Sequence, residues 1–326
     1  IARSMPVPSR FWGEELIWND PANPHNPMMD QKGRVWMTSA IRSRVNPGWC
    51  AEGSDNPYAH YFPLENSFRS AVFYDPDTQQ FVLIDTCYGT HHLQFTEDDH
   101  DTLYFSGDGQ VVGWIDTKMY DETGDEQISQ GWCPTVLDTN GDGTISKPWN
   151  EPDRRGRHGI LDDGLDTRVT IGSYGVIGDP TDDKVVWIAS NRFPGRLMRL
   201  HVGEDPPETC VTELYEVPSV LDPAVPREKT GFGARGIDID RDGVVWTALS
   251  GSSHFASFDR KRCEVRSGPV VVDGRHCVDG WTLYPTPGPV IKGTDPPMRA
   301  DHHYYNWVDQ WNTLGLGENV PIATGS

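Results

Sequence analysis

Residues 234–246 read ARGIDIDRDGVVW, a strand-forming run followed by the turn Arg241-Asp242-Gly243 and a second run that ends at Trp246. An Asp-Gly turn of this kind tolerates the tight geometry of a β-hairpin. The same frame of strand, turn and strand recurs along the chain, so hairpins are expected near residues 24–39, 90–107, 173–190 and 234–251. A repeat of this type predicts similar β units packed side by side.

An aromatic residue follows the turn of each hairpin, at Trp36, Tyr104, Trp187 and Trp246, with spacings of 68, 83 and 59 residues. A bare four-stranded propeller blade needs about 40 to 50 residues. The spacing therefore predicts an all-β chain, a β-propeller whose blades carry long insertions. We expect the main insertion at about 121–165 and another at 261–300.

The chain 1–326 is expected to form a single domain, because propellers routinely use such a length as one unit. Only four repeats are recognisable, whereas a propeller must close its ring. Either an irregular segment at 281–326 closes the ring, or a missing segment or an additional chain completes it. The chain begins at Ile1 without an initiator Met, so we expect a processed product of a longer precursor.

The charge of the chain restricts its partners. Lys and Arg number 28 against 48 Asp and Glu, and the formal net charge is −20. The resulting field opposes the approach of nucleic acid or anionic lipid, so we expect no nucleic-acid partner. No stretch approaches the roughly 18 consecutive apolar residues of a membrane span. Cations and small ligands are the expected partners.

The six cysteines form no C-x-x-C pair, which argues against a zinc knuckle or a thioredoxin-type redox site. Disulfides are the favoured interpretation. Cys263–Cys277 is the first expected bridge because the two residues flank a Gly-rich excursion, and Cys50–Cys87 and Cys133–Cys210 are the remaining pairs. Disulfides predict a periplasmic or secreted protein, although an even number of cysteines also occurs in cytosolic enzymes.

Residues 138–146 read DTNGDGTIS and follow the first nine positions of a calcium loop. The expected ligands are side chains or carbonyls of five residues in this segment and one beyond it, namely Asp138, Asn140, Asp142, Thr144, Ser146 and Glu151. Trp149 occupies the twelfth position, where a bidentate Glu is usual, so the last ligand must come from Glu151, Asp153 or elsewhere. We expect a structural Ca²⁺ site, and the alternative is a turn that binds nothing.

One position of the repeat holds a polar side chain in all four hairpins, namely His25, His91, Tyr174 and Arg235. Because the innermost strand of each blade lines the central channel, these side chains are expected to converge on the axis. His25 and His91 are then candidate ligands of a transition metal or Mg²⁺, or general acid–base groups, and Arg235 a clamp for an anionic ligand. The alternative is that the imidazoles only form hydrogen bonds between blades.

Other histidines are weaker candidates for ligand contacts. His92 is expected to point to the opposite face of its strand from His91, because side chains alternate along a strand. His302 and His303 form a pair near the C-terminal end that no repeat register places. His254 follows the fourth hairpin and is expected to face a ligand.

The segments PHNPMMD at 24–30, GRVWMTS at 33–39 and RGIDIDRDGVVWTAL at 235–249 resemble the blade signature of streptogramin B lyases and related NHL and SMP-30-type propellers. The segments THHLQF at 90–95 and LGLGEN at 314–319 more closely resemble uncharacterised exported bacterial proteins that are described as carrying a carboxypeptidase-regulatory-like domain. The resemblance implies the propeller fold. Streptogramin lyases use a His and a Glu beside Mg²⁺ to open a cyclic ester by elimination, but no residue of this chain matches that pair.

Two functions follow from the sequence. The first is a metal-dependent enzyme, a lyase or hydrolase or an oxidoreductase, with its centre at the mouth of the channel. The second is a non-catalytic binding propeller that belongs to a larger extracytoplasmic assembly. Motifs of serine hydrolases, nucleotide-binding proteins, zincins and c-type cytochromes are absent.

Overall fold

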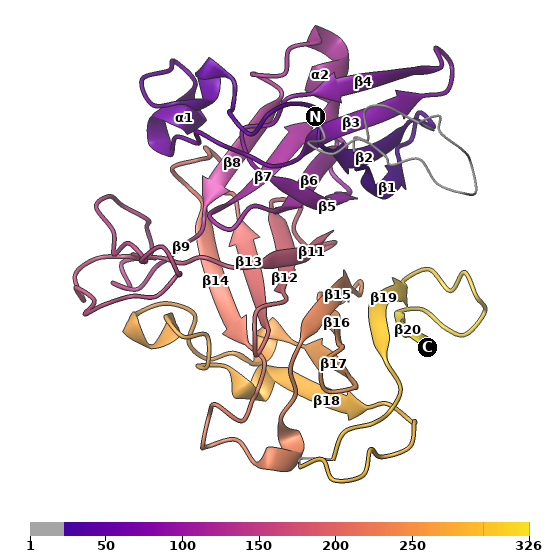
Figure 1. Cartoon of the computed structure of the whole chain (residues 1–326). Helices are drawn as coiled ribbons and strands as arrows, with labels where there is room; N and C mark the ends of the chain where they lie inside the picture. The colour runs from indigo at the N-terminus through magenta and orange to yellow at the C-terminus, as the bar shows by residue number, and fades with distance from the viewer. Residues whose placement is uncertain (1–22, 296, 326) are drawn as a thin grey trace, which may run out of the picture.

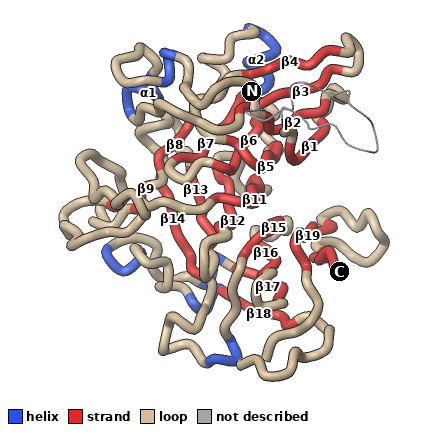
Figure 2. Tube along the Cα trace, in the orientation of Figure 1, coloured by secondary structure: helices blue, strands red, loops and turns tan. Residues whose placement is uncertain are grey.

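The computed structural model describes residues 23–295 and 297–325. The expectations about Ile1, and about the first 22 residues of the domain, lie outside the described residues. Within these ranges the chain folds as a β-propeller, in which separate antiparallel sheets stand side by side (Figure 1). Figure 2 shows that strands and loops make up most of the chain.

Each of the four repeats forms the first two strands of a sheet. The first sheet contains β1 (His25–Met29), β2 (Val35–Ser39), β3 (Ser70–Asp75) and β4 (Gln80–Ile84). The second contains β5 (Thr90–Phe95), β6 (Thr102–Gly107), β7 (Val111–Asp116) and β8 (Gln130–Pro134). The third contains β11 (Ser173–Gly178), β12 (Val185–Ser190), β13 (Arg196–His201) and β14 (Val211–Glu216). The fourth contains β15 (Ala234–Ile239), β16 (Val245–Leu249), β17 (His254–Phe258) and β18 (Trp281–Pro285).

A two-stranded sheet, β19 (His303–Asp309) and β20 (Val320–Gly325), follows the fourth blade. The inner strands β1, β5, β11, β15 and β19 pack against one another in that order, with β1 and β19 at the two ends of the row (Figure 1). Apolar side chains fill the space between neighbouring sheets. Trp132 belongs to the cluster between the first two blades, Leu214 to the next and Phe258 to the third.

Helices are short throughout the described ranges. The two α-helices are α1 (Pro57–Tyr61) and α2 (Thr117–Thr123). The 3₁₀ turns are η1 (Gly48–Cys50), η2 (Arg227–Lys229), η3 (Arg260–Arg262), η4 (Pro269–Val271) and η5 (Val278–Gly280). None of these helices is long and apolar enough to cross a membrane.

The insertions differ from the expected ones. Residues 130–134 form β8, the outer strand of the second blade, so the insertion expected at 121–165 is divided by a strand of the blade itself. Likewise, residues 281–285 form β18 and complete the fourth blade rather than opening an irregular closing segment. In both places the outer strand of the blade follows a long connection, and its five residues contain no part of the repeated pattern. The long loop proper spans residues 138–166.

Two short strands connect the second blade to the third. After β8 the chain forms β9 (Val136–Leu137), which pairs in parallel with β14 on the outer edge of the third sheet. The loop 138–166 then returns as β10 (Thr167–Arg168), which pairs antiparallel with β9. The third sheet therefore has six strands, in the order β10-β9-β14-β13-β12-β11.

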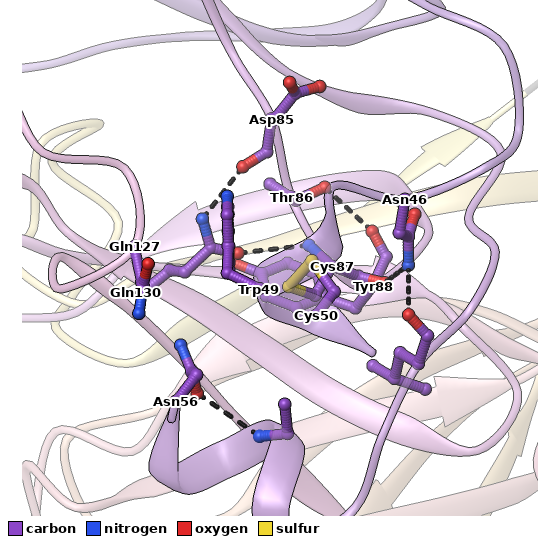
Figure 3. The surroundings of a disulfide bond; sticks show 12 residues. Asn46, Trp49, Cys50, Asn56, Asp85, Thr86, Cys87, Tyr88, Gln127 and Gln130 are labelled. Carbon is purple, nitrogen blue, oxygen red and sulfur yellow. Dashed lines mark hydrogen bonds between the residues drawn. A yellow bond between two sulfur atoms is a disulfide. The ribbon is translucent and has the colours of Figure 1, made fainter. Parts of the chain in front are cut away.

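The structure contains three disulfides, with the pairing expected from the sequence: Cys50–Cys87, Cys133–Cys210 and Cys263–Cys277. Figure 3 shows the first, in which the Cys87 amide donates to the Gln130 side chain at 3.1 Å and Asn46 donates to the Cys87 carbonyl. Cys133–Cys210 joins the second blade to the third. Three such bonds are typical of a protein that folds outside the cytoplasm.

Candidate functional site at the channel

Every inner strand carries a shift in its hydrogen-bond register close to its first residue. The shifts lie between His25 and Met28, Thr90 and Leu93, Ser173 and Val176, Ala234 and Ile237, and His303 and Asn306. A β-bulge places two residues against one on the partner strand and changes the direction of the side chains there. The five bulges lie at the same end of the inner strands, so they direct their side chains at one another.

Three imidazoles meet at this end of the channel. The ring centroids of His25 and His91 are 4.4 Å apart, those of His91 and His92 are 4.4 Å apart, and those of His25 and His92 are 5.1 Å apart. Their ligand nitrogens all lie within 4.8 Å of one another. Among the described residues, this is the group of His, Cys, Asp or Glu side chains with the spacing of a metal site.

The position of His92 differs from the expectation. Regular alternation would place His91 and His92 on opposite faces of β5, but the bulge between Thr90 and Leu93 brings both rings to the same side. The His92 side chain is buried, and its Nε2 accepts or donates no hydrogen bond. A buried ring nitrogen without a partner is costly unless a ligand satisfies it.

The electrostatics of the cluster keep the imidazoles neutral. Burial lowers the pKa of His92 to about 3 and that of His91 to about 4, and the neighbouring imidazoles and the Arg69 guanidinium contribute to both shifts. Burial and Arg69 also lower the pKa of His25. Neutral imidazole is the form that binds metal ions. The cluster therefore presents three neutral imidazoles, with ligand nitrogens close together, near pH 7.

The side chains of Tyr174 and Arg235 lie beside the imidazoles. The rings of His92 and Tyr174 are 4.4 Å apart, and the guanidinium of Arg235 lies 5.1 Å from the centroid of the Tyr174 ring. The hydroxyls of Tyr174 and Tyr304 share a hydrogen bond, and Arg235 donates to Tyr304 at 3.4 Å. Burial, followed by the bond to Tyr304, raises the pKa of Tyr174, so this phenol stays protonated.

The remaining histidine candidates divide between two places. His302 is exposed, and its ring centroid lies 6.1 Å from that of Tyr304, at the edge of the channel cluster. His254 and His303 lie apart from the imidazole cluster, at the first residue of β17 in the fourth blade and the first residue of β19. His303 is buried against Phe255, and His254 shares a 3.1 Å hydrogen bond with Ser252 and lines a separate cavity of about 360 Å³.

The calcium-type loop has the local hydrogen bonds of a folded loop. The Asp138 carboxylate accepts from the amides of Gly141 at 2.7 Å and Gly143 at 3.1 Å. The Asp142 carboxylate accepts from the amide of Thr144 at 2.9 Å, and the Asn140 carbonyl accepts from the Asp142 amide at 3.0 Å. Gly143, at the sixth position, has the left-handed φ of 85° that the sharp turn of such a loop requires.

Glu151 does not turn toward this loop. Its carboxylate accepts from the Trp149 indole at 2.6 Å and from the Arg168 guanidinium at 2.7 Å. Asp153 is likewise bound to Arg157. Both expected sources of the last ligand are therefore neutralised by arginine. The buried carboxylate that does face the loop belongs to Asp166, whose Oδ2 accepts from the Ser146 amide at 2.9 Å.

Sequence reasoning missed three residues at these sites. Tyr304 precedes Asp309 by five residues, as His25 precedes Asp30 and Arg235 precedes Asp240, and this spacing was the signal for a fifth repeat. Arg69 comes from the loop before β3 and has no motif. Asp166 lies 28 residues after Asp138, far outside the span of a calcium loop.

The fold is similar to those of known propellers at low sequence identity. No protein-family model and no curated protein sequence matches the chain. A catalytically inactive virginiamycin B lyase from Staphylococcus aureus, solved with quinupristin, is 12% identical with a TM-score of 0.40, over 86% of this chain and 63% of that one. Regucalcin from Agrobacterium tumefaciens, a calcium-binding protein, is 12% identical with a TM-score of 0.29, over 93% of this chain and 90% of that one. This chain thus spans less than two thirds of the lyase, and such likenesses assign no residue a role.

Proposed function

We propose that this protein is an extracytoplasmic, periplasmic or secreted enzyme of the lyase or hydrolase type, which acts on an anionic small molecule with a metal ion bound at the channel. The observation that carries the proposal is the orphaned Nε2 of buried His92 beside two further neutral imidazoles. The donor set fits a divalent transition metal, because imidazole nitrogen suits Zn²⁺, Cu²⁺, Ni²⁺ and Fe²⁺, and three histidines leave a coordination position open.

His25, His91 and His92 would hold the ion, which when bound supplies a Lewis acid for a carbonyl oxygen or a bound water. Arg235 binds the anionic group of the substrate and, with Arg69, offsets its charge. Tyr174 keeps its proton and donates a hydrogen bond to an oxygen on which negative charge develops. The hydroxyl of Tyr304 holds Tyr174 in that orientation.

Metal binding is tested with Co²⁺, whose visible absorption reports its coordination, on protein stripped with chelator. The wild-type chain is expected to bind one equivalent at the channel. Loss of a residue that hydrogen-bonds to a metal ligand costs about 10- to 100-fold in metal affinity, so His92→Ala, which removes a ligand itself, is expected to cost at least about 100-fold. His254→Ala is the control, because His254 is a partly buried histidine that lies away from the channel.

Turnover is tested with a panel of anionic esters and lactones, with and without Zn²⁺ or Mg²⁺. Hydrolysis adds one water to the substrate, whereas elimination opens a cyclic ester without a change in mass, so mass spectrometry separates the two reactions. Equal Co²⁺ binding by wild type and His92→Ala would contradict the metal site. Tight binding of an anion without turnover would favour the binding propeller instead.

A further inference from the structure

We propose that the loop 138–146 forms a Ca²⁺ site whose final acidic ligand is Asp166, supplied by the strand that returns from the long loop. This site is distinct from the channel and independent of the function proposed for it. Asp138, Asn140, Asp142 and the carbonyl of Thr144 occupy the ligand positions of a calcium loop, and Trp149 stands where the twelfth residue would complete it.

The strand register brings Asp166 to the loop. Leu137 pairs with Thr167 and Val136 with Arg168 in the β9–β10 ladder, so the next step of the ladder sets Asp138 opposite Asp166. Side chains at opposite positions of an antiparallel pair have Cβ atoms about 4.5 to 5.5 Å apart. The hydrogen bond from the Ser146 amide to Asp166 ties the ninth position of the loop to the same carboxylate.

One oxygen of Asp166 is available for an ion. The residue has no exposed surface, yet its Oδ1 accepts no hydrogen bond. The carboxylates of Asp138 and Asp142 lie near enough to Asp166 to repel its negative charge. A buried anion next to two others is unfavourable unless a cation compensates it.

No basic side chain supplies that compensation within the described residues. The hydrogen bonds that Asp138, Asp142 and Asp166 accept there come from backbone amides and from the side chains of Asn140 and Thr144. Two other buried acids of the fold, Glu213 and Glu216, are paired with arginine, namely Arg260 and Arg275. Oxygen ligands with this charge are those that Ca²⁺ prefers.

The site joins two blades. Asp138 directly follows β9, which pairs with β14 of the third blade, and the carbonyl of Asp138 accepts from the Gly268 amide in the fourth blade's excursion. A Ca²⁺ ion held between Asp138 and Asp166 therefore fastens β9 to β10 on the outer edge of the third sheet. Its role is structural, because it ties these two short strands together at the edge of the sheet.

The test is calorimetric titration of the EGTA-treated protein with CaCl₂, together with thermal unfolding. The wild-type chain is expected to bind one Ca²⁺ in the range of extracellular modules, about 10⁻⁴ to 10⁻³ M or tighter. Asp166→Asn is expected to weaken that affinity at least about tenfold. Asp163→Asn and Glu151→Gln are matched controls, because Asp163 is exposed in the same loop and Glu151 is bound to Arg168, and both should bind as the wild type does.

Thermal unfolding separates a ligand from a merely structural carboxylate. In EGTA, Asp166→Asn should unfold at the same temperature as the wild type or higher, because an uncompensated buried charge is removed. In CaCl₂ the wild type should gain stability and Asp166→Asn should not, so the wild type should then unfold at the higher temperature. Unchanged Ca²⁺ affinity in Asp166→Asn, loss of binding in Glu151→Gln, or an absence of Ca²⁺ binding by the wild type would each overturn the proposal.

Discussion

Asp238 is a buried acid in the wall of the channel, at the end opposite the imidazoles. Its Oδ2 accepts from the Val308 amide at 2.7 Å, and its Oδ1 accepts from the Ile239 amide at 2.8 Å. Burial outweighs these two bonds and raises its pKa to about 6. The side chain lines a cavity of about 470 Å³ together with Trp307 and Met28. Its ionisation is therefore linked to the stability of the fold.

The pH dependence of unfolding should reveal this residue. An acid whose pKa is raised by folding stabilises the fold below its unfolded pKa, and the contribution is lost as the pH rises through the folded pKa. With a shift from 3.8 to about 6, the wild type should lose about 2 to 3 kcal/mol between pH 4 and pH 7 from this group. Asp238→Asn should lack that loss in urea unfolding, whereas exposed Asp183→Asn should retain it. Equal pH slopes in wild type and Asp238→Asn would contradict the assignment.

At the same scale, the sequence located the channel residues but not the direction of every side chain. The repeat register identified His25, His91, Tyr174 and Arg235 as equivalent, and the structure brings them together. His92 was assigned to the wrong face because alternation holds only for a regular strand. No residue type near position 92 marks the bulge that breaks it.

Three of the four hairpins share one feature, a hydrogen bond between an Asp at the end of the inner strand and the Trp indole after the turn. Asp30 accepts from Trp36 at 2.8 Å, and Asp179 accepts from Trp187 at 3.0 Å. In the fourth blade, Asp240 accepts from Trp246 at 3.2 Å and also from the amides of Asp242 and Val244. The carboxylate thus fixes the turn and the following strand together.

Removing this carboxylate should destabilise the hairpin. Asp240→Ala leaves the Trp246 indole and two turn amides without their acceptor, and each unsatisfied group costs about 1 to 3 kcal/mol when buried. Because the turn is partly exposed, we expect a total loss of about 2 to 4 kcal/mol in urea unfolding. Asp242→Ala, at an exposed position in the same turn, should change stability by less than about 0.5 kcal/mol. Similar losses of stability in Asp240→Ala and Asp242→Ala would contradict this role of the Asp240 carboxylate.

This Asp–Trp pair explains which strands could be predicted from the sequence. Three of the four repeats carry both Asp and Trp, and the second replaces them with Thr96 and Tyr104. The fifth inner strand, β19, keeps Asp309 but no aromatic residue follows at the start of β20. Outer strands such as β8 and β18 contain neither the Asp nor the Trp of this hydrogen bond. Their positions after long loops could therefore not be predicted from the repeat.

At the scale of the whole molecule, each blade buries its faces against its neighbours, and covalent and hydrogen-bonded links reinforce the boundary between the second and third. Cys133–Cys210 and the β9–β14 pairing both cross it. The register that sets Asp166 opposite Asp138 depends on how the chain returns after the loop 138–166. Such a long-range pairing leaves no local pattern, which is why the sequence identified the calcium-type loop but not the buried carboxylate of Asp166 that faces it.

We expect that the exposed tip of the loop 138–166 can be cleaved without the two fragments separating. Residues 154–157 read Arg-Arg-Gly-Arg, and R154I with R155E turns them into Ile-Glu-Gly-Arg, after which factor Xa cleaves. Gly156, with its φ of 74°, and Arg157, bound to Asp153, are both kept. The cleaved protein should run as one species on a non-reducing gel and as two fragments after reduction, with its circular dichroism unchanged before reduction.

Fragments that part without a reductant, or a loss of β signal on cleavage, would contradict this expectation. The cut leaves Cys133 and β9 on one fragment and Cys210, β10 and β14 on the other, so a disulfide and two strand pairings are expected to hold the fragments together. The propeller is therefore expected to tolerate a break in this surface loop, and the two fragments are expected to complement each other.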